Sequence, residues 1–253
     1  MVPARPKARR HAWVLPAVIL PALIVAQSVF SYSDAKGDLS IRAKDGQGAL
    51  STTGYEFDLM GSVTITSKQR QFVLTASRVK ASIVKSAGSE SPNELKKATA
   101  SGGTRIVQTA SGKSSRLQAN TATYTTQGSG ATVQASGSVR IVNIDQNKRE
   151  TMTATGSSGT ARLDPKSPRG ISAATLNGPV RVEIVQSGGT ASRVVFTGSK
   201  MTLSGSQVSL TGNVKASGAG ASRFGNLSNV DSVTVTLNER GEFSRFTFRS
   251  GGG

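Results

Sequence analysis

The sequence of 253 residues predicts an all-β fold built from repeated bent hairpins. Apolar and polar residues alternate over nine-residue stretches, which is typical of a half-buried strand. A glycine occupies the centre of each stretch, and the stretches recur along the chain. No helical periodicity of useful length follows residue 34. We therefore expect a repetitive β-protein.

Four segments share the pattern apolar-x-apolar-x-Gly-x-apolar-x-apolar, at 57–65, 133–141, 174–182 and 208–216, and a weaker copy lies at 98–106. The central glycines are separated by 41, 35, 41 and 34 residues; they are Gly61, Gly102, Gly137, Gly178 and Gly212. Glycine inside a strand marks a bulge or a sharp bend. Because it shares the parity of the apolar residues, we expect it to face inward. A returning strand follows each copy, and such hairpins stack into a meander, a jelly roll or a solenoid.

Residues 89–97 carry charges, a proline and an asparagine, and are predicted to form a loop. Residues 164–170 contain two prolines and a glycine, which predicts a turn. No interdomain linker is evident. We therefore expect residues 34–250 to form one β domain.

Residues 1–33 predict a membrane segment. Four basic residues precede an uncharged apolar run at 12–30, which as a helix would span about 28 Å of membrane. The positive-inside rule places the N-terminus in the cytoplasm and the body outside it. A cleaved signal peptide is the alternative, with cleavage near 26–28 or 31–33. The run is longer than a typical signal core, which favours a retained transmembrane anchor.

The chain carries 31 Lys and Arg against 14 Asp and Glu, a formal net charge of +17. This excess predicts an anionic partner such as nucleic acid, a membrane surface or an acidic glycolipid. Because the body is expected to be exported, we expect no nucleic-acid partner. Envelope lipids and polysaccharides are favoured instead.

The composition excludes several familiar enzyme classes. The chain has no cysteine and a single histidine, His11, so it has neither a Ser-His-Asp triad nor a cysteine-ligated metal site. The glycine pairs at 102–103 and 188–189 lack the Lys-Ser/Thr of a phosphate loop. We expect no enzymatic activity, no cofactor and no metal.

Two stretches carry a family resemblance. Residues 117–124 (LQANTATY) precede the copy at 133–141, and residues 196–203 precede a copy containing Gly212-Asn213-Val214. They resemble the OstA-like repeat of lipopolysaccharide-transport proteins, over roughly residues 38–237. The resemblance implies an open β-jellyroll, preceded here by one N-terminal transmembrane or signal helix, with an apolar interior that holds acyl chains. It implies a periplasmic bridge or an inner-membrane-anchored member. The implied partners are lipopolysaccharide or another anionic lipid, other β-jellyroll transport proteins and a membrane transporter complex.

A groove for acyl chains needs a continuous inward face of aliphatic side chains, since each buried CH₂ is worth about 0.8 kcal/mol. The inward positions after each glycine meet this need, and the lipid-groove candidates are Val63, Ile65, Val139, Ile141, Val180, Val182, Phe196 and Val214. The same residues would also suit the core of any β sandwich. The adjacent Arg140, Arg181 and Lys215 alternate to the outer side.

An open β-domain must leave an edge strand on which another chain can pair. The last two alternating runs, at 233–237 and 245–249, are the candidates for this edge. Their docking residues are Val233, Val235, Phe246 and Phe248.

Two functions remain from different classes. The first is a periplasmic lipopolysaccharide-transport scaffold that carries acyl chains towards the outer membrane, and the resemblance favours it. The second is a structural or adhesive envelope protein that binds anionic polysaccharide through its basic outer face. The alternating repeat lengths suit hairpins better than the regular coil of a solenoid.

Overall fold

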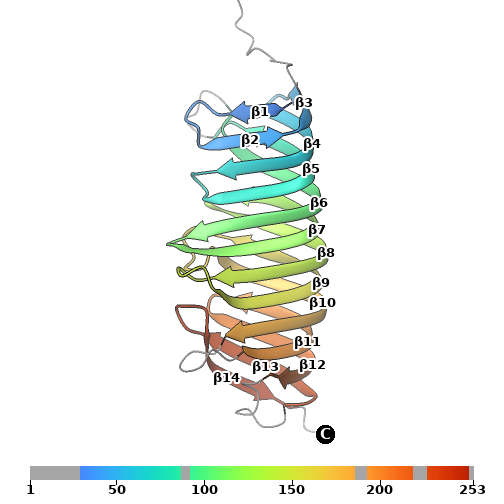
Figure 1. Cartoon of the computed structure of the whole chain (residues 1–253), viewed down its shortest axis with the longest axis vertical. Coiled ribbons are helices and arrows are strands. Elements are labelled where there is room, and N and C mark those ends of the chain that lie inside the picture. Colours follow the sequence, from blue (N-terminus) through green and yellow to red (C-terminus); the bar gives the residue numbers. More distant parts are fainter. Residues whose placement is uncertain (1–28, 87–91, 186–192, 219–226, 251–253) are drawn as a thin grey trace, which may run out of the picture.

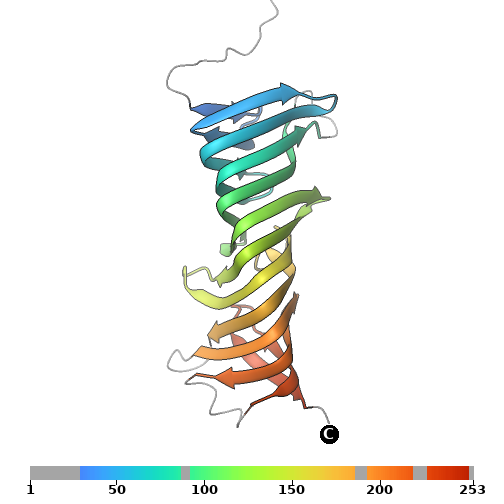
Figure 2. The same cartoon turned by 90° about the vertical axis from the view of Figure 1, so that its right-hand side faces the viewer.

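The computed structural model describes residues 29–86, 92–185, 193–218 and 227–250. These residues form one open antiparallel sheet of 14 strands, stacked in sequence order along the long axis of the molecule (Figures 1 and 2). The all-β prediction is confirmed. No helix among the described residues has the length and hydropathy to cross a membrane. Residues 12–28 of the expected N-terminal helix lie outside the described residues, and its last expected residue, Phe30, begins the first strand of the sheet.

The strands are bounded as follows: β1 (Phe30–Ser33), β2 (Leu39–Ala43), β3 (Asp45–Leu50), β4 (Gly54–Ser67), β5 (Phe72–Val84), β6 (Glu94–Ala110), β7 (Lys113–Gln127), β8 (Gly130–Ile144), β9 (Glu150–Leu163), β10 (Ile171–Val185), β11 (Arg193–Ser204), β12 (Gln207–Ser217), β13 (Val230–Leu237) and β14 (Phe243–Arg249).

Each strand from β4 to β14 pairs with its neighbours in sequence. At the N-terminal end, β2 and β3 pair with the two halves of β4. Lys44 separates them, and its backbone N–H donates to the carbonyl of Gly61 at 2.7 Å. Together β2 and β3 therefore act as one strand that bends at Lys44.

The long strands bend at the five central glycines, where the pairing register shifts. In β8 the shift falls between Ser136 and Val139, and Gly137 and Ser138 have φ of 75° and 55°. Both angles are in the left-handed region, which turns the chain and inserts residues that face no partner. Glycine supplies this geometry in every copy, so the repeat in the sequence becomes a line of bends along the molecule.

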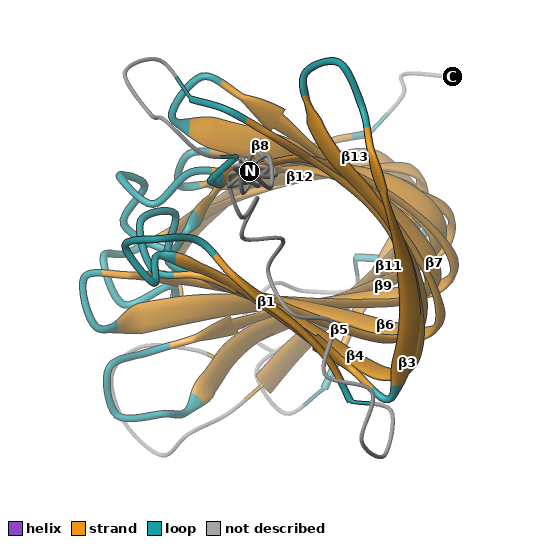
Figure 3. Ribbon diagram, turned by 90° about the horizontal axis from the view of Figure 1, so that it is seen from above, coloured by secondary structure: helices purple, strands orange, loops and turns teal. Residues whose placement is uncertain are grey.

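The bends fold the sheet into two facing arms. Viewed down the long axis, the arms meet at the bend on the right and most turns gather on the left (Figure 3). Arm 1 contains the strand residues within 45–60, 78–84, 94–101, 121–136, 158–177, 200–211 and 232–249. Arm 2 contains those within 30–43, 63–76, 104–119, 139–156, 180–185, 193–198 and 214–217. The buried apolar side chains fill the space between the arms.

Three expectations need correction. The glycines do not face inward: a Cβ built on Gly137 would lie 2.7 Å from the side chain of the exposed Asn120, because the left-handed bend interrupts the alternation. The sheet begins at Phe30 rather than after residue 33, since β1 pairs with β2. Residues 94–97 belong to β6 instead of a loop, because they continue its pairing with β5.

Candidate functional site

The apolar space between the arms is the candidate site. All eight predicted groove residues lie on arm 2 and point into this space, and none is more than 2% exposed; they are Val63, Ile65, Val139, Ile141, Val180, Val182, Phe196 and Val214. Their pairing is consistent across strands, as Val182 faces Phe196 and Ile141 faces Leu117. They form one continuous wall.

The opposite wall is on arm 1 and was missing from the sequence-based candidates. It includes Leu59, Val133 and Leu176, each fully buried on the strand segment before a bend. The signal for it was available, because these residues are the apolar positions that precede the glycine in each repeat. The two walls are in direct contact: the aromatic ring of Phe72 on arm 2 packs against that of Tyr124 on arm 1, with centroids 4.7 Å apart.

Within the described ranges, the strand faces that line this space carry no buried charged side chain. Among the described residues, the buried charged side chains are Asp34, Asp145, Arg169 and Glu242, and all four lie in turns. A charge inside an apolar space carries a large desolvation cost. The interior is therefore suited to apolar groups along its whole described length.

Aromatic rings close the N-terminal end of the interior. Phe30 of β1 packs edge-on against Phe57 of β4, with centroids 5.1 Å apart, and Tyr32 packs against Tyr55 and Phe57. The Tyr32 hydroxyl donates to the carbonyl of Pro92. Burial, followed by the nearby Tyr55 and Asp34, raises the pKa of Tyr32 to about 12. Tyr32 therefore stays neutral and protonated at physiological pH.

Large apolar residues are exposed on the two edge strands of arm 1. Leu50 of β3 is 81% exposed at one end, beside a hollow of about 660 Å³ lined by residues 50–55, Lys85 and Pro92. Phe248 of β14 is 53% exposed at the other end and stacks on Phe246. The predicted docking residues Val233 and Val235 lie on β13 instead, fully buried between β12 and β14.

The turns at the open side of the sheet form two lips. Lip 1 comprises the arm 1 turns at 51–53, 128–129, 164–170, 205–206 and 238–242, and lip 2 comprises the arm 2 turns at 34–38, 68–71, 111–112 and 145–149. Arg70 of lip 2 crosses to arm 1, where it donates to the carbonyls of Gly128 and Gly130 and pairs with Glu94 at 2.6 Å. The lips are thus joined by polar contacts.

Arg169 holds the middle of lip 1. Its guanidinium donates to the carbonyls of Gly205 at 2.9 Å and Asn238 at 3.0 Å, which ties three turns together. Its own carbonyl accepts from the hydroxyl of Ser115 on arm 2 at 2.6 Å. Burial lowers the pKa of Arg169, but an arginine remains charged at neutral pH.

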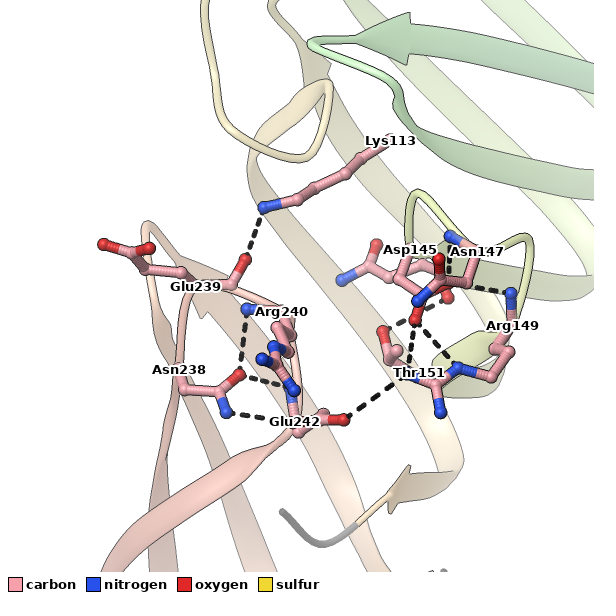
Figure 4. Close-up of polar contacts among 10 residues, drawn as sticks. Lys113, Asp145, Asn147, Arg149, Thr151, Asn238, Glu239, Arg240 and Glu242 are labelled. Carbon is pink, nitrogen blue, oxygen red and sulfur yellow. Dashed lines mark hydrogen bonds and ion pairs between the residues drawn. The ribbon is translucent and has the colours of Figure 1, made fainter. Parts of the chain in front are cut away.

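Further contacts join the lips near the C-terminal end (Figure 4). The Lys113 ammonium donates to the Glu239 carbonyl at 2.6 Å, and Arg149 lies 4.0 Å from Glu242. Burial would raise the pKa of Asp145, but hydrogen bonds from Arg149 and the Asn147 N–H outweigh it and lower the pKa. The ionised Asp145 therefore shapes this turn of lip 2, and the seam between the lips covers the side of the interior opposite the bend.

Comparisons with known proteins add no assignment. No family model, curated protein or solved structure matches the chain. Among the described residues, no three acidic or histidine side chains are grouped so that they could hold a metal ion. The geometry of the interior and the surface is therefore the basis for the proposals below.

Proposed function

We propose that the chain is a periplasmic lipid-transport scaffold that carries the acyl chains of lipopolysaccharide or another anionic lipid between its two arms. In this proposal the bent sheet is an open β-jellyroll, the residues before Phe30 anchor it in the inner membrane, and lipid moves towards the outer membrane. The observation that supports it is the apolar face that continues across every long strand with no buried charge on it. Each acyl CH₂ placed there would gain about 0.8 kcal/mol.

The interior is filled by side chains, so acyl chains must part the arms to enter. The bend is fixed by backbone pairing, whereas the lips are joined by side-chain contacts such as those of Arg70 and Lys113. Side-chain contacts near the surface are weaker than a continuous β ladder. The lips are therefore the side at which we expect lipid to enter.

Photo-crosslinking tests this function. We expect p-benzoylphenylalanine in place of the buried Phe196 to form adducts with lipopolysaccharide, because this side chain lies between the arms. The same probe in place of Thr202, which is exposed on the same strand, should form none. Mass spectrometry of the irradiated full-length protein measures the adducts. Equal labelling at both positions, or none at Phe196, would contradict the proposal.

We also propose that β14 docks on a β-domain partner or a second copy of the chain. One side of β14 pairs with β13, and Phe248 extends the apolar interior to the exposed end of the sheet. We expect Phe248→Glu to abolish self-association measured by analytical ultracentrifugation, because docking would bury the added charge. Thr247→Glu, on the outer face of the same strand, is the matched control. Unchanged association of the Phe248 variant would exclude this docking edge for self-association.

A further inference from the structure

One row of outward-facing residues runs across the outer face of arm 2. Strand pairing places its ten members opposite one another from β2 to β12; they are Arg42, Thr64, Thr75, Arg105, Gln118, Arg140, Thr155, Arg181, Thr197 and Lys215. We call this set the cationic row. It consists of basic, hydroxyl and amide side chains, and it lies on the side of the sheet opposite the apolar interior.

The basic residues of the cationic row recur at a fixed place in the repeat. Arg105, Arg140, Arg181 and Lys215 each follow the central glycine of their strand by three positions. Each is two strands from the next, which sets a spacing of about 9.6 Å along the sheet. The repeat that builds the bend thus also builds a regular array of positive charge.

Much of this charge is available to a ligand. Arg42, Arg105 and Lys215 are exposed, and within the described ranges they have no ion-pair partner. Arg140 pairs with Glu150 at 3.1 Å and Arg181 with Glu183 at 2.7 Å. Exposed ion pairs of this kind contribute little to stability, so a ligand can replace their acidic partners.

The basic side chains of the cationic row form a single line along the outer face of arm 2. The next outward row of arm 2 contains one basic and one acidic residue, Arg116 and Glu183, together with several valines. On the other side the line of bends is rich in glycine, serine and asparagine. A ligand that matches the cationic row must therefore be narrow and carry regularly repeated negative charges.

We propose that the cationic row binds a linear anionic polysaccharide lying along the long axis of the sheet. Strands in a sheet are rotated by about 20–25° from one to the next, so the row winds around the axis. A flexible polymer can follow this path, whereas a planar membrane surface would contact only part of it. Threonine and glutamine between the cations can hydrogen-bond sugar hydroxyls. This outer surface is separate from the interior and does not depend on lipid binding there.

The proposal predicts a dependence on ligand length. Arg42 and Lys215 are nine strand steps apart, about 43 Å along the sheet. Affinity for oligogalacturonates should rise with length until an oligomer spans the row, and should then level off. Binding should weaken with added salt, because the contacts are between exposed charges.

Two triple variants of the full-length protein test the site with polygalacturonate as the probe. R42Q/R105Q/K215Q removes the unpaired cations of the cationic row and should weaken binding about tenfold. K97Q/R162Q/K200Q removes three exposed cations from the outer face of arm 1, with the same change in net charge. We expect the second variant to bind within twofold of the parent protein. Isothermal titration calorimetry measures both, and circular dichroism checks that both fold.

The outcomes separate the alternatives. Equal loss in both variants would show that net charge alone attracts the polymer and would overturn the proposal. Binding to vesicles of anionic phospholipid but not to polygalacturonate would assign this charge to a membrane surface instead. Lipid adducts at Phe196 would be unaffected by either result, so failure here is distinguishable from failure of the lipid-transport function.

Discussion

Replacing Arg169 with methionine is expected to lower the free energy of unfolding by about 2–3 kcal/mol. Arg169 is 8% exposed, and its guanidinium donates to the carbonyls of Gly205 and Asn238, which belong to two other turns of lip 1. Methionine fills a similar volume but donates no hydrogen bond. Both carbonyls would lose a charged donor, and each loss costs about 1–3 kcal/mol. Removal of the buried charge offsets part of that cost.

Chemical denaturation of the variant and the parent protein measures this change. Arg162→Met is the matched control, because Arg162 is exposed on arm 1, and we expect it to alter stability by less than about 0.5 kcal/mol. Hydrogen exchange should accelerate in the turns at 164–170, 205–206 and 238–242. If both variants unfold at the same denaturant concentration as the parent, Arg169 does not hold the lip together.

The sequence contains the information for the interior but not for the seam between the lips. Alternation identifies the inward residues of a strand locally, so Val139 and Ile141 could be assigned from their own segment. The contact of Lys113 with Glu239 joins residues 126 positions apart. It depends on how far the two arms are offset along the axis, a property of the whole twisted sheet. No pattern within one repeat reports that offset.

The sequence also predicted the cationic row only in part. Alternation correctly placed Arg140, Arg181 and Lys215 on the outer side. Their alignment with Arg42 and Arg105 required the register of nine strand pairs, including the shift at every bend. A one-residue change in register would move a side chain to the other face. Charge in the sequence therefore predicted a basic surface without predicting its linear form.

The glycines show where alternation itself failed. A period of two placed Gly137 inward, whereas its missing side chain would point at Asn120 on the outer side. The second bend position accepts serine or asparagine at positive φ, as in Ser62, Ser138 and Asn213, with φ of 52°, 55° and 51°. Backbone conformation alone therefore does not explain why the first position is glycine in all five copies. The lack of space beside the neighbouring strand explains why the first position is glycine.

Gly137→Ala is accordingly expected to lower the free energy of unfolding by about 3 kcal/mol. A left-handed conformation costs a residue with a side chain about 1–2 kcal/mol. The new Cβ would also lie 2.8 Å from the Cβ of Asn120, an atom fixed to the backbone of β7. Relieving that overlap requires a shift of the strand, and overpacking of this kind costs about 1–3 kcal/mol.

Gly112→Ala separates these two costs. Gly112 has the same φ as Gly137, 75°, but a Cβ there meets nothing within 4 Å. We expect this control to lose only the backbone contribution, about 1–2 kcal/mol. Thermal and urea unfolding of both variants provide the comparison. In the Gly137→Ala background, Asn120→Gly should restore part of the stability, because it removes the overlapping side chain. Equal destabilisation of the Gly112 and Gly137 variants would mean that close strand approach does not set the bend.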